Sequence, residues 1–408
     1  MLDYSKILQE IKPSDSEQKY LLEESNKLIS SLNKQLKGAR ACLGGSLAKN
    51  TNIKGDFEVD IFVAFSYSKH KDKDISKELA KTLKKYRPKK IHGSRDYFQI
   101  KQKNINFEIV PILDLKDIKK SQNTTDLSPF HVAWVKNKAK KDLVDQIRLA
   151  KHFAYSNNIY GAESHIGGFS GYLLEVLVIH YKGFENFLKA TSKWKQKEVL
   201  DPSKRYKSIK YAYEKLNFSK KASPLVVIDP IDKTRNIAAA LSKEKYLEFI
   251  ALAKKYLQKK DNSFFVKKSF SLKHLKDHII LVAVPIEGKD DVAGSKIKKI
   301  KEYLASKLSE NDFVLKDSIF YFGRPSYIAF KIKKEPLPKI KKHYGPPKHL
   351  QIHLQAFQKK FGVEIFFEKN KSYVLVKRKY LYAKDLIQDL ITKDNYIKDK
   401  VKEIGFLS

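Results

Sequence analysis

The sequence predicts an α+β protein of several parts, and three observations carry that prediction. Apolar and polar residues alternate over residues 57–63 and 105–109, which is typical of half-buried strands. Between residues 142 and 190 the pattern becomes mainly helical, and short strand-like runs return after about residue 256. These observations together predict a helical middle between two α+β ends.

The first element we expect is a helix that begins near Ser14. Ser14 and Glu17 have the spacing of a capping box, with Pro13 outside it. Behind them leucine and isoleucine recur at roughly helical spacing as far as Leu36. The two strands of the alternating runs follow, the first around Val59 and the second around Phe107.

Further elements are expected along the rest of the chain. A basic, polar surface loop with a short helix is expected over 193–221, and a helix pair over 236–258. HIILVAVPI and SYIAFKI predict strands around a helix at KIKKIKEYLASKL. VEIFFEKNKSYVLVKRK predicts a hairpin that turns at 369–371.

Composition indicates which class of partner the protein binds and in which cellular compartment it is expected. The 408 residues include 82 Lys plus Arg and 46 Asp plus Glu, a net charge of +36. This excess predicts a polyanionic partner such as nucleic acid, although a Lys-rich solvated surface would give the same total. The one cysteine, Cys42, excludes an internal disulfide framework and a Cys-based zinc site, and we expect it in a buried strand. No apolar stretch approaches the length of a membrane span, so a soluble, cytoplasmic protein without membrane contact is expected.

A glycine loop and three carboxylates carry the chemistry. Gly44-Gly45-Ser46 precedes Glu58-Val-Asp60, and residues two apart on a strand share a face, so both carboxylates project together. Hard oxygen ligands at this spacing suit Mg²⁺, and the loop suits phosphates. The third carboxylate, Glu108, lies on the polar face of the later strand. Each feature alone is ordinarily a turn or a solvated face, but their order along the chain favours a site.

This order resembles the signature of the polymerase-β-like nucleotidyltransferases. GGSLAKNT, EVDIFVAF and FEIVPIL are similar in particular to the archaeal, class I, CCA-adding tRNA nucleotidyltransferases. The likeness continues in order through TDLSPFH, YGAE, GFSGYL, DPID with RNIAAAL, and YGPP, over nearly the whole chain. Glu108 stands where the family usually has Asp, Lys49 where it has Arg, and Leu47 where it has an aromatic residue.

The resemblance implies a template-independent polymerase that adds C, C and A to the 3′ end of tRNA. CTP and ATP would be the substrates, pyrophosphate would be released, and two Mg²⁺ ions would assist the transfer. The catalytic residues and metal ligands would be Glu58, Asp60 and Glu108. The nucleotide would be bound by Gly45, Ser46, Lys49, His131, Lys151, Tyr160 and Arg235, of which Arg235 would read the base. We expect Glu163 and Glu175 to make structural hydrogen bonds, and Asp229 and Asp232 to fix the loop that aims Arg235.

The resemblance also implies a division into parts. A polymerase-β-like head with a mixed sheet would span 1–142, a helical neck 143–255, an α+β body 256–289 and 346–408, and an inserted tail 290–345. Body and tail would grip the acceptor and T arms of tRNA. Two alternatives stay open, another template-independent RNA nucleotidyltransferase such as a poly(A) polymerase, and a tRNA-binding homologue with a dead site. A homodimer also stays open.

Overall fold

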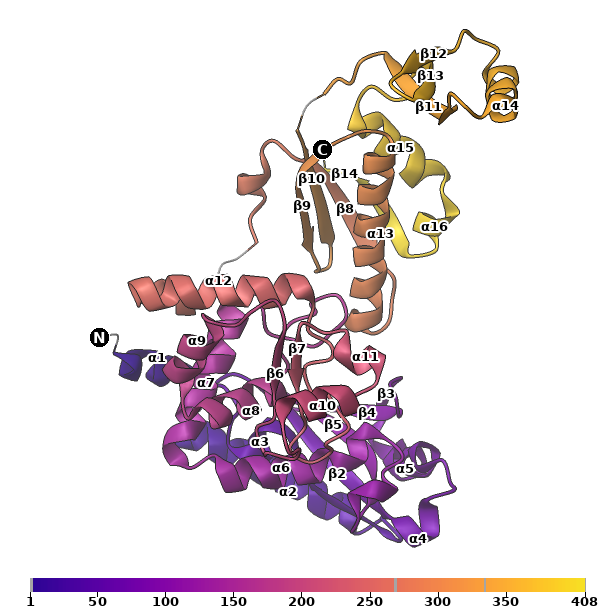
Figure 1. Ribbon diagram of the computed structural model, residues 1–408. Helices are drawn as coiled ribbons and strands as arrows, with labels where there is room; N and C mark the ends of the chain where they lie inside the picture. Colours follow the sequence, from indigo (N-terminus) through magenta and orange to yellow (C-terminus); the bar gives the residue numbers. More distant parts are fainter. Residues whose placement is uncertain (1–2, 268–269, 334, 408) are drawn as a thin grey trace. The chain divides into compact units, whose positions relative to one another are not determined.

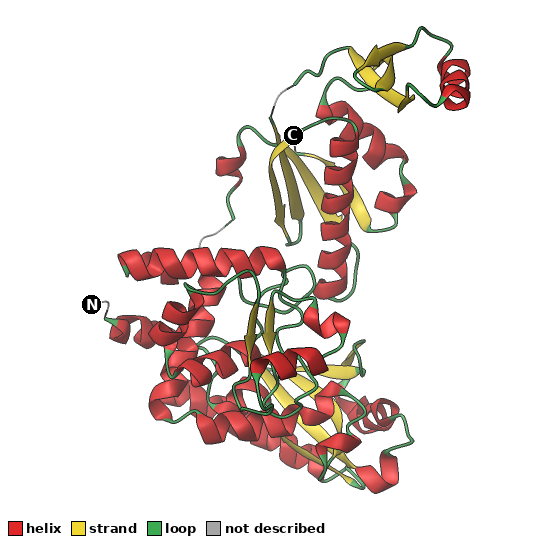
Figure 2. Cartoon of the chain, in the orientation of Figure 1, coloured by secondary structure: helices red, strands yellow, loops and turns green. Residues whose placement is uncertain are grey.

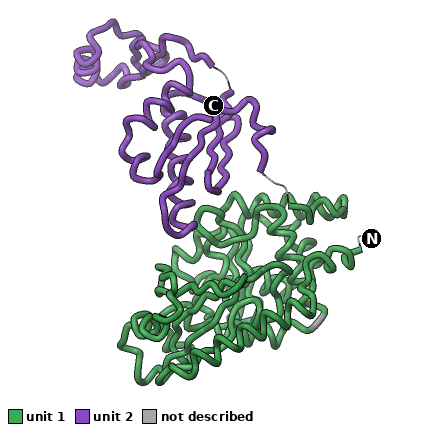
Figure 3. Tube along the Cα trace, turned by 180° about the vertical axis from the view of Figure 1, so that it is seen from behind, with its two compact units in different colours: residues 1–268 green, residues 269–408 purple. Residues whose placement is uncertain are grey.

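The computed structural model describes residues 3–267, 270–333 and 335–407, and the chain forms two compact units. Unit 1 comprises residues 1–268 and unit 2 residues 269–408 (Figure 3). Both units contain helices and strands (Figure 2), so the predicted α+β class is confirmed. No helix among the described residues has the length and apolar character needed to cross a membrane.

A five-stranded mixed sheet forms the first part of unit 1, and one of its faces is covered by helices. The strand order is β1-β2-β5-β4-β3, in which β2 and β5 are parallel and the other neighbours antiparallel. Apolar residues of α2 and α5 pack against Val59, Ile61 and Val63 of β2. The elements are β1 (Ala39–Leu43), β2 (Glu58–Ser66), β3 (Lys89–Ile91), β4 (Tyr97–Gln102), β5 (Ile105–Asp114), α2 (Asp15–Asn33) and α5 (Ile75–Leu83).

The start of α2 shows how the predicted capping box is used. The Ser14 hydroxyl accepts a hydrogen bond from the backbone N–H of Glu17 at 3.1 Å, which confirms Ser14 as the N-cap. The Glu17 carboxylate instead accepts from the N–H of Gly55 at 2.8 Å. Glu17, the second residue of the predicted capping box, therefore links the helix to the loop before β2.

Helices with an aromatic core form the second part of unit 1. Phe153 lies at the centre of this core and contacts the rings of Phe184, Tyr256 and Phe265 at 5.4–5.6 Å. Ile7 of the first helix also packs here, although it belongs to the predicted head. The helices are α1 (Tyr4–Ile11), α6 (Ser128–Lys138), α7 (Lys141–Ser156), α8 (Gly171–Tyr181), α9 (Phe184–Thr191) and α12 (Lys243–Lys259) (Figure 1).

Residues 193–258 differ from their prediction in two places. The basic stretch contains β6 (Glu198–Leu200), paired with β7 (Leu225–Val227), as well as α10 (Ile209–Lys215) and α11 (Phe218–Lys221). The predicted helix pair over 236–258 is wrong, because only α12 is helical. The Asn236 side chain accepts hydrogen bonds from the N–H groups of Val227 and Ala238, which holds 236–241 as a turn, and Ser242 caps α12.

Unit 2 contains a four-stranded antiparallel sheet in the order β14-β8-β10-β9. Along the chain its elements alternate as βαββαβ. Apolar residues of α13 and α15 pack on one face of the sheet. The elements are β8 (Ile279–Pro285), α13 (Asp290–Glu310), β9 (Leu315–Tyr321), β10 (Ser326–Ile332), α15 (Ala383–Lys393), α16 (Asn395–Lys398) and β14 (Val401–Phe406).

A smaller sheet is inserted into unit 2 between β10 and α15. It consists of β11 (Ile340–Pro347), β12 (Phe366–Glu368) and β13 (Lys371–Lys377), with α14 (Gln351–Phe361) beside it. The predicted hairpin is present as β12 and β13, and its turn at residues 369–370 is one residue shorter than the predicted 369–371, because Lys371 pairs with Glu368.

The structure groups residues 290–345 differently from the predicted body and tail. Leu281 of β8, Ile297 of α13 and Ile328 of β10 share one apolar core, because β8 is hydrogen-bonded directly to β10. Residues 340–377, rather than 290–345, stand outside that core as the inserted piece. The boundary at 142/143 stays a prediction.

We predict that Phe153→Ala destabilises unit 1 strongly. Phe153 is completely buried among aromatic rings, and deleting such a ring costs about 3–5 kcal/mol in free energy of unfolding. Phe218→Ala is the matched control, because Phe218 is 89% exposed and its loss should change stability by less than about 0.5 kcal/mol. Urea unfolding measures both, and equal effects would contradict the aromatic core.

Candidate active site

The parallel pairing of β2 with β5 brings the predicted carboxylates onto one face of the sheet. Asp60 is the register partner of Glu108, and Glu58 is the partner of Asn106. Glu58 and Asp60 project from the side opposite Val59, which is buried under the helices. Gln99 of β4 donates a hydrogen bond to Glu108 Oε1 at 2.9 Å and so orients this carboxylate.

The glycine loop lies directly against Asp60. Gly45 has a φ of +58°, and a Cβ built on it would overlap the Asp60 carboxylate. The N–H of Gly44 donates to the backbone carbonyl of Asp60 at 2.8 Å. The loop leads into the short helix α3 (Gly45–Lys49), which contains Ser46 in its first turn. Glycine is therefore required at position 45 both by conformation and by space.

Two of the carboxylates, Glu58 and Asp60, have pKa values above the usual range. Burial raises the pKa of Asp60 to about 6, with a further contribution from Glu108. Burial likewise raises the pKa of Glu58, and the nearby charges of Glu108 and Asp56 add to it. The charge of Lys49 lowers the pKa of Asp60 but does not offset the rise caused by burial and by Glu108.

The donor chemistry fits a hard divalent cation, because all three predicted ligands supply carboxylate oxygens. In the described residues, 3–267, 270–333 and 335–407, no three His, Cys, Asp or Glu side chains are grouped closely enough to hold a metal ion. The three carboxylates share a face, but their side chains do not converge on one point.

A buried carboxylate on α8, Glu175, gathers the predicted phosphate ligands. Glu175 Oε2 accepts from Lys49 Nζ at 2.6 Å, while Oε1 accepts from Lys151 Nζ at 2.8 Å and from Thr51 Oγ1 at 2.7 Å. Burial would raise the pKa of Glu175, but the two ammonium groups outweigh it and hold the pKa at about 2. Glu175 therefore makes the structural hydrogen bonds that we expected of it. Lys49 and Lys151 are both held in place by ion pairs with this carboxylate.

Tyr160 lies beside the same cluster. A β-bridge joins it to Phe169, and its hydroxyl lies 2.9 Å from the position that a Cβ on Gly171 would take. Lys151 Nζ lies 3.8 Å from that same point. The absence of a side chain at Gly171, the first residue of α8, therefore leaves room for both groups.

A second buried carboxylate, Asp229, gathers the remaining predicted ligands. His131 Nε2 lies 3.0 Å from Asp229 Oδ2, and Arg235 Nη1 donates to the same oxygen at 2.9 Å. The ring of Tyr172 of α8 packs at a tilt against the His131 ring, with centroids 4.4 Å apart, and its hydroxyl donates to Asp229 Oδ1 at 3.4 Å. The carbonyl of Asp232 accepts from the N–H of Arg235 at 2.9 Å. Asp229 and Asp232 thus contact Arg235 as expected.

Helix α8 links the two clusters through residues three apart on one face. Tyr172 reaches the Asp229 cluster, Glu175 holds the lysines, and Lys49 Nζ lies 5.9 Å from the centre of the Tyr172 ring. Five of the seven predicted nucleotide ligands therefore lie around one helix, whereas Gly45 lies against Asp60; the five are Lys49, His131, Lys151, Tyr160 and Arg235. Sequence reasoning missed Gln99, Thr51 and Tyr172; the i, i+3 spacing of Tyr172 and Glu175 in GFSGYLLE was the available signal.

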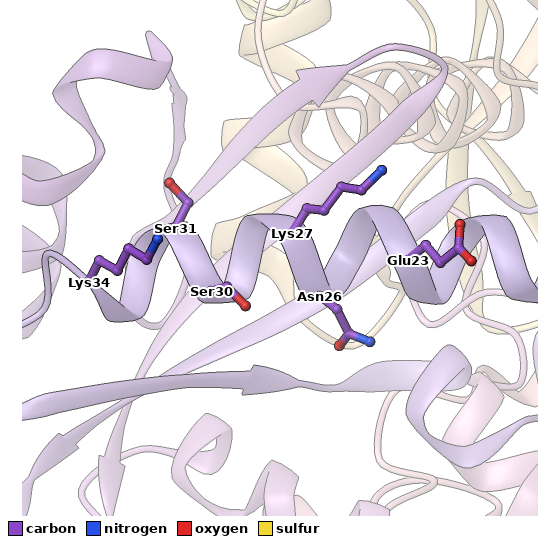
Figure 4. A pocket seen from close by; sticks show the side chains of 6 residues that line it. All are labelled: Glu23, Asn26, Lys27, Ser30, Ser31 and Lys34. Atoms are coloured by element: carbon purple, nitrogen blue, oxygen red, sulfur yellow. The ribbon is translucent and has the colours of Figure 1, made fainter.

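A surface depression of about 540 Å³ lies elsewhere, along the exposed face of α2 (Figure 4). Its lining residues come from that helix and its C-cap, Lys34, and none is a predicted site residue. They are Glu23, Asn26, Lys27, Ser30, Ser31 and Lys34.

Comparison with known proteins gives three family matches along the chain. Residues 2–156 match the Second Messenger Oligonucleotide or Dinucleotide Synthetase domain, and residues 145–266 match the second domain of tRNA nucleotidyltransferase. Residues 284–404 match the C-terminal domain of the CCA-adding enzyme. The matches therefore extend over both units.

Solved structures show the same fold at low sequence identity. The Cid1 poly(U) polymerase superposes with a TM-score of 0.51 at 15% identity, over 64% of this chain and 97% of its own. A cytoplasmic RNA terminal U-transferase gives a TM-score of 0.50 over 65% of this chain and 97% of its own, also at 15% identity. The nucleotidyltransferase fold expected from the sequence is confirmed.

Curated archaeal proteins are similar over most of the chain. The CCA-adding enzyme of Nanoarchaeum equitans is 37% identical over 83% of this chain and 84% of its own length. That of Methanocaldococcus jannaschii is 29% identical over 94% of this chain and 89% of its own. With the carboxylates, the glycine loop and the α8 clusters in place, these similarities show that the chain belongs to the CCA-adding enzyme family of tRNA nucleotidyltransferases.

Proposed function

We propose that this protein adds C, C and A to the 3′ end of tRNA from CTP and ATP, without a nucleic-acid template and with release of pyrophosphate. The observation that carries the proposal is the pairing of Asp60 with Glu108 on one sheet face, directly against the Gly45 turn. The net charge of +36 supports a tRNA partner, and a reducing cytoplasm suits the single cysteine. A homodimer stays a prediction.

We assign the carboxylates Glu58, Asp60 and Glu108 to two Mg²⁺ ions. When bound, the ions supply positive charge that favours the ionised primer hydroxyl and the leaving pyrophosphate. Gln99 orients Glu108, and Gly45 leaves the space that the Asp60 carboxylate needs. The raised pKa values support the assignment, because a cation would relieve the repulsion that causes part of the shift.

The nucleotide is assigned to the two α8 clusters. Ser46, Lys49 and Lys151 would contact the triphosphate, and His131 and Tyr160 the phosphates and ribose. Arg235 would read the base, since its guanidinium has five donors, is 32% exposed and is held by Asp229 through Nη1. Because Asp229 binds His131 and Arg235 on one oxygen, ribose and base contacts would be oriented together.

The two alternatives are less well supported. A catalytically dead homologue would not need Glu58, Asp60 and Glu108 on one face beside the glycine turn. A poly(A) polymerase would share the fold. The sequence, however, is similar to CCA-adding enzymes over most of the chain, and this similarity includes their C-terminal domain.

The first prediction from this proposal concerns the product. With tRNA that lacks its 3′ CCA, Mg²⁺, CTP and ATP, the protein is expected to add three nucleotides and stop. Gel electrophoresis of labelled tRNA measures the length and order of addition. Asp60→Ala is the control, and it should abolish addition while tRNA binding persists. A long A tail would contradict CCA addition.

The second prediction concerns the charge of Asp60. Its folded pKa, about 6, lies above the ordinary value of 3.8, so its contribution to stability is fully present below about pH 3.8 and is lost as pH rises through 6. Without Mg²⁺ at pH 7.5, Asp60→Asn should therefore raise the melting temperature by about 6–12 °C, the effect of about 3 kcal/mol, and at pH 4 it should have little effect. Differential scanning calorimetry measures both values.

The control for this experiment is Asp114→Asn, an exposed carboxylate at the end of β5, which should change the melting temperature little at either pH. Added Mg²⁺ should stabilise the wild-type protein more than Asp60→Asn. Equal stabilisation by Mg²⁺ would remove Asp60 from the metal site.

The third prediction concerns Glu175. Glu175→Gln leaves the buried Lys49 and Lys151 ammonium groups without a carboxylate, so a loss of about 3–5 kcal/mol in free energy of unfolding is expected. Glu248→Gln, which breaks a more exposed pair with Lys245, should cost less than about 1 kcal/mol. Urea unfolding compares the two, and a similar small loss in both would contradict the role of Glu175.

A further inference from the structure

The loop that carries Arg235 is held from outside by a neighbouring basic segment. We call residues 229–235 the Arg235 loop and residues 201–221 the basic segment. The basic segment contains α10 and α11 and is rich in lysine, in the sequence DPSKRYKSIKYAYEKLNFSKK. Neither the catalytic carboxylates nor the phosphate ligands lie in it.

Bonds within the Arg235 loop set its local shape. The N–H of Asp229 donates to the carbonyl of Arg235 at 3.0 Å. Asp229 Oδ1 accepts from the N–H of Ile231, and Asp232 Oδ1 accepts from the N–H of Thr234, each at 2.9 Å. These contacts close the loop on itself, but they leave the carbonyls along its tip to be satisfied by other groups.

The basic segment supplies donors for those carbonyls. The Tyr206 hydroxyl donates to the carbonyl of Lys233 at 2.8 Å, and Lys220 Nζ donates to the carbonyl of Thr234 at 2.6 Å. Arg205 Nη2 donates to the carbonyl of Ile231 at 3.4 Å, a longer and weaker contact. Lys233 and Thr234 are the two residues that immediately precede Arg235, so two strong contacts act on the backbone next to it.

The basic segment is itself anchored, so it can act as a support. The N–H of Tyr206 donates to Asp201 Oδ2 at 2.9 Å. Ala212 and Leu216 of the segment share a small buried core with Val226 and Ile228, which lie just before the Arg235 loop. The donors therefore stand on a fixed base rather than on free side chains alone.

We propose that Tyr206 and Lys220 are positioning residues that set nucleotide selection by fixing the backbone from which Arg235 reaches the base. This inference rests on the proposed function, in which Arg235 reads the incoming base. A base edge is distinguished by the placement of donors and acceptors, so a shift of the guanidinium reduces discrimination more than it reduces binding of the triphosphate.

The test compares nucleotide selection in two variants and two matched controls. Tyr206→Phe removes only the hydroxyl, and Lys220→Met removes only the ammonium group. Tyr211→Phe and Lys210→Met make the same chemical changes at exposed positions of the basic segment. Among the described residues, no hydrogen bond from the side chain of Tyr211 or Lys210 to the Arg235 loop is found. Melting temperatures are measured for all four variants.

Selection is measured as a ratio of kcat/KM values on defined tRNA ends. On tRNA that lacks CCA the ratio is CTP over UTP, and on tRNA that ends in CC it is ATP over GTP. We expect Tyr206→Phe and Lys220→Met each to reduce these ratios by about threefold to tenfold, the effect of one hydrogen bond. Both controls should retain the wild-type ratios, and all four variants should still add nucleotides.

A double-variant comparison separates positioning from general damage. If Tyr206 acts through Arg235, adding Tyr206→Phe to Arg235→Ala should not reduce the selection ratios further. A further reduction of the same size in the double variant would overturn the inference, and so would unchanged ratios in the two single variants.

The proposed function can fail separately in the same experiment. If the wild-type protein adds neither C nor A, the proposed function falls, and this inference falls with it. If it adds CCA and Arg235→Ala blurs selection while Tyr206→Phe and Lys220→Met do not, only this inference is overturned.

Discussion

The need to neutralise one buried carboxylate, that of Glu175, constrains the arrangement of the whole candidate site. A buried charge is tolerated only when it is paired and hydrogen-bonded, and Glu175 meets this need with Lys49, Thr51 and Lys151. Two of these partners follow the glycine loop and one lies on α7. The carboxylate therefore fixes the glycine loop relative to the helices and, through Gly45, fixes it relative to Asp60 as well.

A second buried carboxylate, that of Asp229, is also neutralised by surrounding side chains. There the buried carboxylate is satisfied by His131, Tyr172 and Arg235, which come from three separate segments. Helix α8 carries Tyr172 and Glu175 on one face and so takes part in both clusters. Phosphate ligands and base ligands are thus placed by a shared scaffold, in which a displacement of α8 affects both.

Much of the site could be predicted from local patterns, because strands impose their alternation on the sequence. Val59 and Ile61 had to be buried, so Glu58 and Asp60 had to share the opposite face, and the structure agrees. The parts that failed depend on specific side-chain hydrogen bonds, which the spacing of apolar residues does not reveal. The side chain of Asn236 holds a turn where apolar spacing predicted a helix, and Thr51 meets Glu175 from 124 residues away. The bounds of the inserted sheet depend on the pairing of β11 with β13, which are distant in sequence and whose pairing the local pattern does not show.

The way the small sheet is inserted into unit 2 has an evolutionary consequence. The connecting segments that lead into and out of the insertion are hydrogen-bonded to each other: the N–H of Leu337 donates to the carbonyl of Leu381, and the N–H of Arg378 donates to the carbonyl of Lys339. Because entry and exit coincide, the host sheet and its helices close without the inserted piece. Descendants of such a gene are free to lengthen, shrink or exchange this module while the βαββαβ host keeps its strand order, so variation among related proteins should concentrate there.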